Sequence, residues 1–159
     1  MKLKSPGRTL TLKQAADALG VAEGFVLTLT LTGAKRPADQ GGELVEIDYA
    51  VAAGELTFTP AGVDRFRARC PVAEWVGPVE VEKRLGVRRG EVSGLVYTGI
   101  PGRDGRVVRL PVWVVGNREY VSRADLEAFA EEFAAWAERK AARDLKKKYT
   151  RAPKPAASE

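Results

Sequence analysis

The sequence contains no histidine and only one cysteine, Cys70, among its 159 residues. Without histidine, neither a Cys/His zinc site nor a Ser-His or Cys-His nucleophile can form, and one cysteine cannot make an internal disulfide. No glycine-rich loop runs into the Lys-Ser/Thr pair of a P-loop. We therefore expect no catalytic residues, no metal and no cofactor. An enzyme built from Asp, Glu, Lys and Tyr alone is the least favoured function.

Long apolar runs and thermolabile residues are also scarce. No apolar run approaches the roughly 18 residues that span a bilayer. The first seven residues carry charge but no apolar core of a signal peptide. We expect a cytoplasmic protein without membrane contact. The single Asn, single Met and two Gln are typical of a thermophile or a GC-rich genome.

Charge is distributed unevenly along the chain. Residues 1–76 hold nine basic and nine acidic side chains, whereas residues 77–159 hold seventeen and twelve, which gives 17 − 12 = +5. The whole net charge of +5 thus lies in the second half. Such an asymmetry favours a polyanionic partner for that half, although a solvated basic surface would produce the same count.

The two halves repeat one plan. Residues 12–21 and 79–87 each predict a helix that ends at Gly-Val, and glycine at this point suits a left-handed C-cap. Residues 58–66 and 121–129 each place a Thr or Ser N-cap before a helix. The copies are offset by 66 residues at the first motif and 63 at the second. The sequence therefore predicts a tandem repeat with a small length change between the two motifs.

Each half is expected to form a hairpin between its helices. Residues 44–51 alternate and return through 55–58, and residues 112–115 meet 119–121 across a Gly-Asn-Arg turn. Residues 22–32 of the first half fit a helix and a strand equally well. The first hairpin carries four acids, which would be repelled by phosphate: Glu43, Glu46, Asp48 and Glu55.

These elements define the predicted fold class and domains. We expect an α+β protein of tandem winged helix-turn-helix-like modules with a long C-terminal helix. The first module is residues 1–76, the second is 77–148, and 149–159 form a disordered tail. The first module is expected to pack on the second, on a twin subunit or on another protein.

The second module has the features of a nucleic-acid reader, with nine Lys/Arg against three acids between residues 83 and 123. Residues 88–98 are the expected recognition helix, with Ser93 and Tyr97 outward. The opposite side is expected to pack on Val81 and Leu85. The full set of expected DNA contacts is Arg84, Arg88, Arg89, Ser93, Tyr97, Arg103, Arg106, Arg109, Asn117 and Arg118.

Residues 112–129 (VWVVGNREYVSRADLEAF) carry a family resemblance. They resemble the wing and final helix of excisionase-type and MerR-like winged helix-turn-helix proteins, and Gly99-Ile-Pro101 is similar to the turn after the recognition helix of that group. The layout of 79–129 also resembles the DNA-binding domain of phage terminase small subunits. The resemblance implies duplex DNA as partner, a helix in the major groove, and an arginine-bearing wing on the backbone or minor groove.

The last helix is expected to start at Ser122 and to reach Lys148. Its apolar residues follow a 3-4-3 spacing, typical of a short coiled coil or of a helix packed on its own domain: Leu126, Phe129, Phe133 and Trp136. The first interpretation predicts a homodimer through Phe129, Phe133 and Trp136. The basic segment 146–151 is expected either to add phosphate affinity or to be solvated.

The resulting functional prediction is a duplex-DNA-binding factor of phage or mobile-element type. It would act as a regulator, an excision or architectural factor, or a packaging recognition subunit. The alternative is a protein-interaction module that binds and modulates the transcription or replication machinery. In that case residues 25–31 of the first module would be the docking face.

Overall fold

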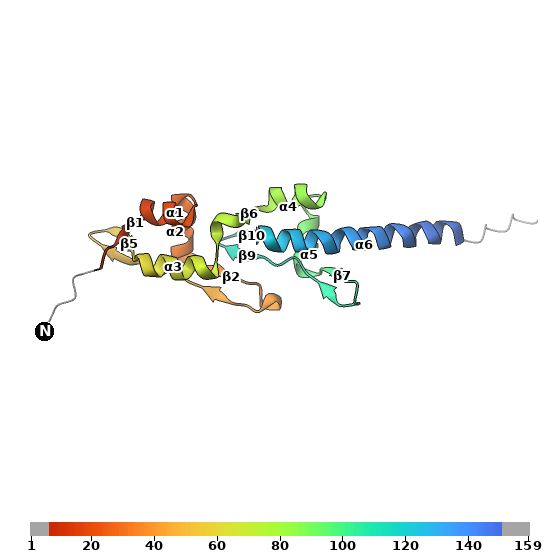
Figure 1. The fold of residues 1–159 in the computed structure, drawn as a ribbon, viewed down its shortest axis with the longest axis horizontal. Coiled ribbons are helices and arrows are strands. Elements are labelled where there is room, and N and C mark those ends of the chain that lie inside the picture. Colours follow the sequence, from red (N-terminus) through yellow and green to blue (C-terminus); the bar gives the residue numbers. More distant parts are fainter. Residues whose placement is uncertain (1–6, 151–159) are drawn as a thin grey trace, which may run out of the picture.

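The computed structural model describes residues 7–150. Figure 1 shows an elongated molecule from which the last helix extends at one end. The elements in chain order are β1 (Leu10–Thr11), α1 (Leu12–Leu19), α2 (Glu23–Thr32), β2 (Ala34–Lys35), η1 (Ala38–Gln40), β3 (Leu44–Val45), β4 (Ala50–Ala52), β5 (Glu55–Phe58), α3 (Pro60–Arg69), η2 (Val72–Glu74), β6 (Trp75–Val76), α4 (Pro78–Leu85), α5 (Glu91–Tyr97), β7 (Ile100–Pro101), β8 (Val107–Val108), β9 (Trp113–Val115), β10 (Arg118–Ser122) and α6 (Arg123–Thr150).

The order of strands and α-helices in the first half recurs in the second. Strands β1, β5 and β4 pair in the order in which β6, β10 and β9 pair, and the β2–β3 hairpin recurs as β7–β8. The starts of α1 and α4 (Leu12 and Pro78) and of β2 and β7 (Ala34 and Ile100) are 66 residues apart, and counterparts from β3 and β8 onward (Leu44 and Val107) are 63 apart. The predicted offsets are therefore present, and the three-residue change falls in the loops 36–43 and 102–106.

The predicted helix ends are confirmed by their local geometry. Gly20 and Gly86 close α1 and α4 in the left-handed region, with φ of 72° and 66°. The hydroxyl of Thr59 accepts the N–H of Gly62 at 3.0 Å, which caps α3. Ser122 accepts the N–H of Asp125 at 3.1 Å and caps α6 in the same way.

The segment that fitted both a helix and a strand is the helix α2. Its threonines are accommodated because their hydroxyls donate to carbonyls in the preceding turn, as Thr28 does to Gly24 at 3.1 Å. Val26 and Leu29 are buried on its inner side. Helix α1 lies before it at an angle of 97°, and no single helix of the described chain is long and apolar enough to cross a membrane, although this bent pair reaches that length together.

Two predicted elements have different bounds in the structure. The recognition helix predicted over 88–98 is only α5, Glu91–Tyr97, because the preceding residues form a turn in which the Glu91 carboxylate accepts the N–H of Arg88 at 3.2 Å. The prediction of a single strand over 44–51 is wrong. It divides into β3 and β4, in two different sheets, because Ile47 between them is buried and Asp48 pairs with Arg65 at 2.7 Å.

Helix α6 is longer than predicted. It continues to Thr150, so Tyr149 and Thr150 are helical and the tail predicted to begin at residue 149 was placed too early. Residues 151–159, predicted to be disordered, lie outside the described residues. The helix is buried only near its start, and from residue 141 to 150 every residue is exposed.

The two halves are joined by one sheet with the strand order β3-β2-β9-β10-β6. β2 pairs antiparallel with β9, so that Ala34 lies opposite Val115. Beside this pairing, the Trp75 and Trp113 rings stack at 5.6 Å, and Trp113 and Val115 belong to the core of the first half. The first module therefore packs on the second module of the same chain, one of the three partners expected from the sequence.

This junction corrects the prediction that the hairpin over 112–121 projects as a wing. The hairpin forms as β9–β10, but its outer edge is occupied by β2. Its turn meets α2, where the N–H of Gly116 donates to Thr32 at 3.1 Å. A Cβ at Gly116 would lie 2.9 Å from Thr28, and its φ is 61°, so glycine is required at this contact.

Gln40 fixes the loop of the first half to the second half. Its side-chain oxygen accepts the N–H of Val112 at 2.9 Å, and its amide nitrogen donates to the carbonyl of Leu110 at 3.0 Å. Leu110 and Val112 are buried, so these backbone groups have little access to water.

We therefore expect Gln40→Ala to lower the free energy of unfolding by about 1–3 kcal/mol, because it leaves buried backbone groups without partners. Urea denaturation followed by circular dichroism would measure the loss. The matched control is Asp39→Asn, which removes only a 3.6 Å surface ion pair with Arg109 and should cost less than about 1 kcal/mol. Equal losses for the two variants would contradict the role assigned to Gln40.

Candidate nucleic-acid interface

Helix α5 has an inner and an outer face, as predicted. Val92, Leu95 and Val96 are buried in one cluster with Val81 and Leu85 of α4. Ser93 and Tyr97 are exposed and lie one turn apart on the opposite face. The short α5 is thus held by its apolar side and presents a hydroxyl and a phenol outward.

The turn of the β9–β10 hairpin lies beside this outer face. Arg89 and Ser93 from the α5 region and Asn117 and Arg118 from the turn line one hollow of about 610 Å³. Helix α4 closes it with Pro78, Val79 and Glu82. Four of the ten residues predicted to contact DNA therefore meet at a single place, which we call the α5 groove.

The cations of the α5 groove are available for a ligand. In the described part of the chain, Arg89 and Arg118 form no ion pair, and neither does the neighbouring Arg88. The groove also contains two acids, Glu82 and Glu119. It is therefore a mixed surface with hydrogen-bonding groups between its charges, unlike a uniformly basic patch.

Glu119 holds the side chain of Tyr97. The Tyr97 hydroxyl donates to the Glu119 carboxylate at 3.0 Å. This hydrogen bond raises the pKa of Tyr97 above its usual value, and the nearby negative charge of Glu119 acts in the same direction. The phenol therefore stays protonated, and it is hydrogen-bonded to an acid that lines the groove.

Arg84 lies away from this groove, on the side of α4 that faces α6. Its guanidinium donates twice to the Glu127 carboxylate, at 2.8 and 2.7 Å. This hydrogen bonding lowers the pKa of Glu127 and raises that of Arg84, so both remain charged and neutralise each other. The structure does not bring Arg84 together with the α5 groove.

The three loop arginines predicted to contact DNA have different positions. Arg109 donates to the carbonyl of Tyr97 at 3.1 Å and lies 3.6 Å from Asp39, so it belongs to the junction. Arg103 and Arg106 lie in the turn between β7 and β8, a hairpin seen below α6 in Figure 1. This β7–β8 hairpin was missed from the sequence, where Val107-Val108 between two arginines was its only signal.

The first module presents a different outer face at the same positions. Leu27 and Leu31 of α2 lie 66 residues before Ser93 and Tyr97, and they are 42% and 84% exposed. Ala22 and Glu23 stand where the second module has Arg88 and Arg89. The outward face of α2 is therefore apolar and has no cation at its start.

The C-terminal helix offers less to a second copy than predicted. Phe129 is 2% exposed, inside the core of its own module. Phe133 and Trp136 are partly buried against the same core, and the amine of Lys140 lies 5.2 Å above the Trp136 ring. A partner approaching this stripe would meet only the outer edges of Phe133 and Trp136.

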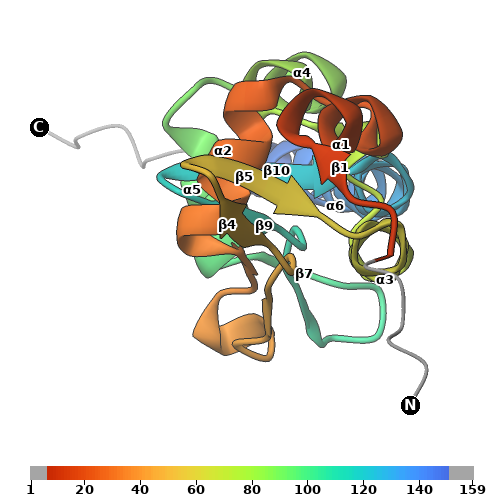
Figure 2. The same ribbon diagram turned by 90° about the vertical axis from the view of Figure 1, so that its left-hand side faces the viewer.

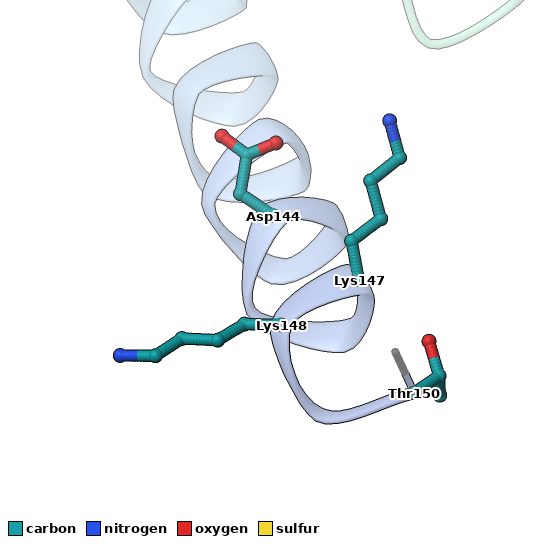
Figure 3. Close-up of a pocket in the computed structure, with 4 residues that line it drawn as sticks. All are labelled: Asp144, Lys147, Lys148 and Thr150. Carbon is teal, nitrogen blue, oxygen red and sulfur yellow. The ribbon is translucent and has the colours of Figure 1, made fainter. Parts of the chain in front are cut away.

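The exposed end of α6 carries lysines that do not converge. Figure 3 shows Asp144, Lys147, Lys148 and Thr150 around a shallow hollow, with the side chains of Lys147 and Lys148 pointing in different directions. Such an arrangement suits diffuse attraction of an anion rather than a formed site.

Comparison with protein-family models, with curated proteins and with solved structures finds no match to this chain. In residues 7–150, no group of three or more Cys, Asp or Glu side chains is placed to hold a metal ion.

The Tyr97–Glu119 contact gives a measurable property of the α5 groove. We expect Glu119→Gln to lower the pKa of Tyr97 toward its ordinary value, because the variant removes the charged acceptor and the repulsion of a tyrosinate. Spectrophotometric titration of tyrosine would detect the shift. The Tyr97→Phe variant identifies which transition belongs to this residue. A titration of Tyr97 unchanged by Glu119→Gln would show that the two side chains do not interact in solution.

Proposed function

We propose that the protein binds duplex DNA through the α5 groove. The observation that carries the proposal is the meeting of Arg89, Ser93, Asn117 and Arg118 around one hollow beside an outward-facing helix. Arginines suit phosphate oxygens, whereas hydroxyl and amide groups suit base edges. Both kinds of group line the α5 groove. A protein that contacts base edges in a DNA groove and the phosphates beside them needs both.

We further propose that each half is a winged helix-turn-helix-like module. In the second half α4 and α5 are the two helices, joined by the turn that begins at Gly86, and β9–β10 is the hairpin that follows. The repeated order of elements in both halves supports this assignment. The role proposed for the protein is that of a phage- or mobile-element-type factor, either a regulator, an excision or architectural factor, or a packaging recognition subunit.

We propose that the β7–β8 hairpin is the wing of the second module. The β9–β10 hairpin cannot project, because β2 covers its edge. Arg103 and Arg106 lie instead on the β7–β8 turn, and the Arg106 side chain is 89% exposed. We propose that these two arginines contact the DNA backbone next to the site read by α5. Glu119 lines the groove and repels phosphate, so its end of the groove favours base edges.

A second function is favoured by the first module. Leu27 and Leu31 form an exposed apolar face where the second module has Ser93 and Tyr97. Exposed apolar helix faces commonly receive protein partners. The protein would then connect DNA to a component of the transcription or replication machinery. A protein-interaction module that binds no DNA is the alternative to the proposed function.

A duplex-DNA mobility-shift assay over a range of salt concentrations tests the DNA-binding proposal. We expect Arg89→Ala/Arg118→Ala to weaken binding and to reduce the slope of log affinity against log salt by about 2, since each phosphate contact contributes about 0.9. The matched control is Arg65→Ala/Arg67→Ala, which removes the same charge from two ion-paired arginines of the first module. Equal effects of the two double variants, or no binding at low salt, would overturn the proposal.

A further inference from the structure

At the junction between the two halves, the outer edge of a hairpin strand pairs with a strand from the other half. β2 adds to the outer edge of β9, and β9 is the counterpart of β4. Yet β4 pairs only with β5, and the described chain places no strand on its other edge. Figure 2 shows β4 and β5 at the end of the molecule that faces the viewer. The side chain of Val51 in this strand is 65% exposed.

The backbone of β4 is prepared for a further strand. Ala52 and Glu55 flank a two-residue turn, so they form the hydrogen-bonded pair that closes the hairpin. By alternation the N–H and C=O of Val51 point away from β5. The surrounding stretch, residues 37–64, contains six acidic residues, of which four pair with arginines outside the stretch, so that Glu46 and Glu55 carry the negative charge that is not offset. A strand that pairs with β4 should therefore carry cationic flanks.

The strand that corresponds to β2 cannot supply this pairing. β2 presents Lys35 to Val114 of β9, and the matching residue in β7 is Pro101, which has no N–H to donate. The carbonyl of Pro101 is already taken, because Arg139 of α6 donates to it at 3.0 Å. At this edge of β7 the backbone N–H is absent and the backbone carbonyl already accepts a hydrogen bond, so a further strand cannot pair with Pro101.

The neighbouring strand β8 has the required chemistry. Its two valines lie between Arg106 and Arg109. The N–H of Gly102 donates to Arg106, and Val108 lies opposite Ile100, so by alternation the N–H and C=O of Val107 point away from β7. The Val107 side chain is 55% exposed. β8 is thus an extended edge with unpaired backbone groups, and the turn before it carries Arg103 and Arg106 against one acid, Asp104.

We propose that β4 of one copy pairs antiparallel with β8 of a second copy. All seven strand pairings in the structure are antiparallel. In this orientation the turn before Glu55 lies beside the turn that carries Arg103 and Arg106, so opposite charges meet. In the assembly these two arginines face the acidic turn of the next copy, and in a single copy they remain free to contact the DNA backbone. Because the β4 surface of one copy meets the β8 surface of the next, the contact joins copies head to tail. Such an assembly carries one α5 groove per copy.

Pairing of like edges is less favourable. Two β4 edges related by a two-fold axis would place Glu55 of each copy near Asp48 of the other, an acid already paired with Arg65, so no unpaired cation would face Glu55. Two β8 edges would bring their arginines together. Like charges opposite each other destabilise strand pairs, so the complementary pairing is preferred.

Proline substitutions on the two edges test the proposal by complementation. Val51→Pro and Val107→Pro each remove an N–H that faces outward, so the internal hairpins keep their hydrogen bonds. We expect the wild type to exceed its single-chain mass of 17.2 kDa in sedimentation equilibrium, increasingly with concentration and less at high salt. Each variant alone should remain at the single-chain mass. An equal mixture should form a complex of one copy of each, because each variant retains the edge that the other has lost.

A charge reversal provides a second pair of variants if a proline variant fails to give the far-ultraviolet circular dichroism of the wild type. Glu55→Arg and Arg103→Glu should each weaken assembly, and mixing them should restore it. A wild type that stays at the single-chain mass would overturn the proposal. A mixture that forms no complex would do the same. Assembly abolished by Val51→Pro but unaffected by Val107→Pro would instead show a symmetric β4 contact and also overturn it.

Discussion

The pairing of β2 with β9 is the interaction on which the rest of the molecule depends. A two-residue strand contributes little by itself, but it lies beside the stacked rings of Trp75 and Trp113 and the hydrogen bonds of Gln40. The guanidinium of Arg36 completes the contact, 4.1 Å from the Trp113 ring, and burial lowers its pKa. Backbone, aromatic and amide contacts at one place hold the two halves together, and Trp75, Trp113 and Val115 join the core of the first half while the second half keeps a core of its own.

This pairing also determines which parts of the second half can reach a ligand. Because β2 covers one edge of the β9–β10 hairpin, that hairpin lies inside a sheet and its turn is pressed toward α2 and α5. The same constraint brings Asn117 and Arg118 next to Arg89 and creates the α5 groove. It leaves the β7–β8 hairpin to project with Arg103 and Arg106. The hairpin that projects is therefore β7–β8, whereas the sequence predicted that β9–β10 would project.

Local signals in the sequence predicted the local elements well. Gly20, Gly86, Thr59 and Ser122 act at the helix ends for which their chemistry suits them, and the offsets of 66 and 63 residues are those of the paired elements. The outward direction of Ser93 and Tyr97 followed from helical periodicity alone. The meeting of Arg89, Ser93, Asn117 and Arg118 was predicted only as a shared set of contacts, and its geometry required the tertiary structure.

What the sequence could not predict depends on contacts between distant residues. The split of 44–51 follows from the burial of Ile47 and from the Asp48–Arg65 ion pair, neither of which leaves a periodic signal. The covering of the β9 edge requires the partner strand β2, almost eighty residues away in the sequence. Arg84 was indistinguishable from the other cations until its double hydrogen bond to Glu127 was seen. These contacts join residues that are distant in the sequence, so local composition and spacing do not predict them.

The two copies of the repeat separate the contribution of the backbone from that of the side chains. Their order of elements is the same, so fold alone would give both modules the same ability to bind DNA. The outer face of α2 has Ala22, Glu23, Leu27 and Leu31 where α5 and its turn have Arg88, Arg89, Ser93 and Tyr97. A polyanion would be attracted to the second set and not to the first, since only the second has cations and directed polar groups. The two modules therefore differ at these four positions in the chemistry that they present to solvent.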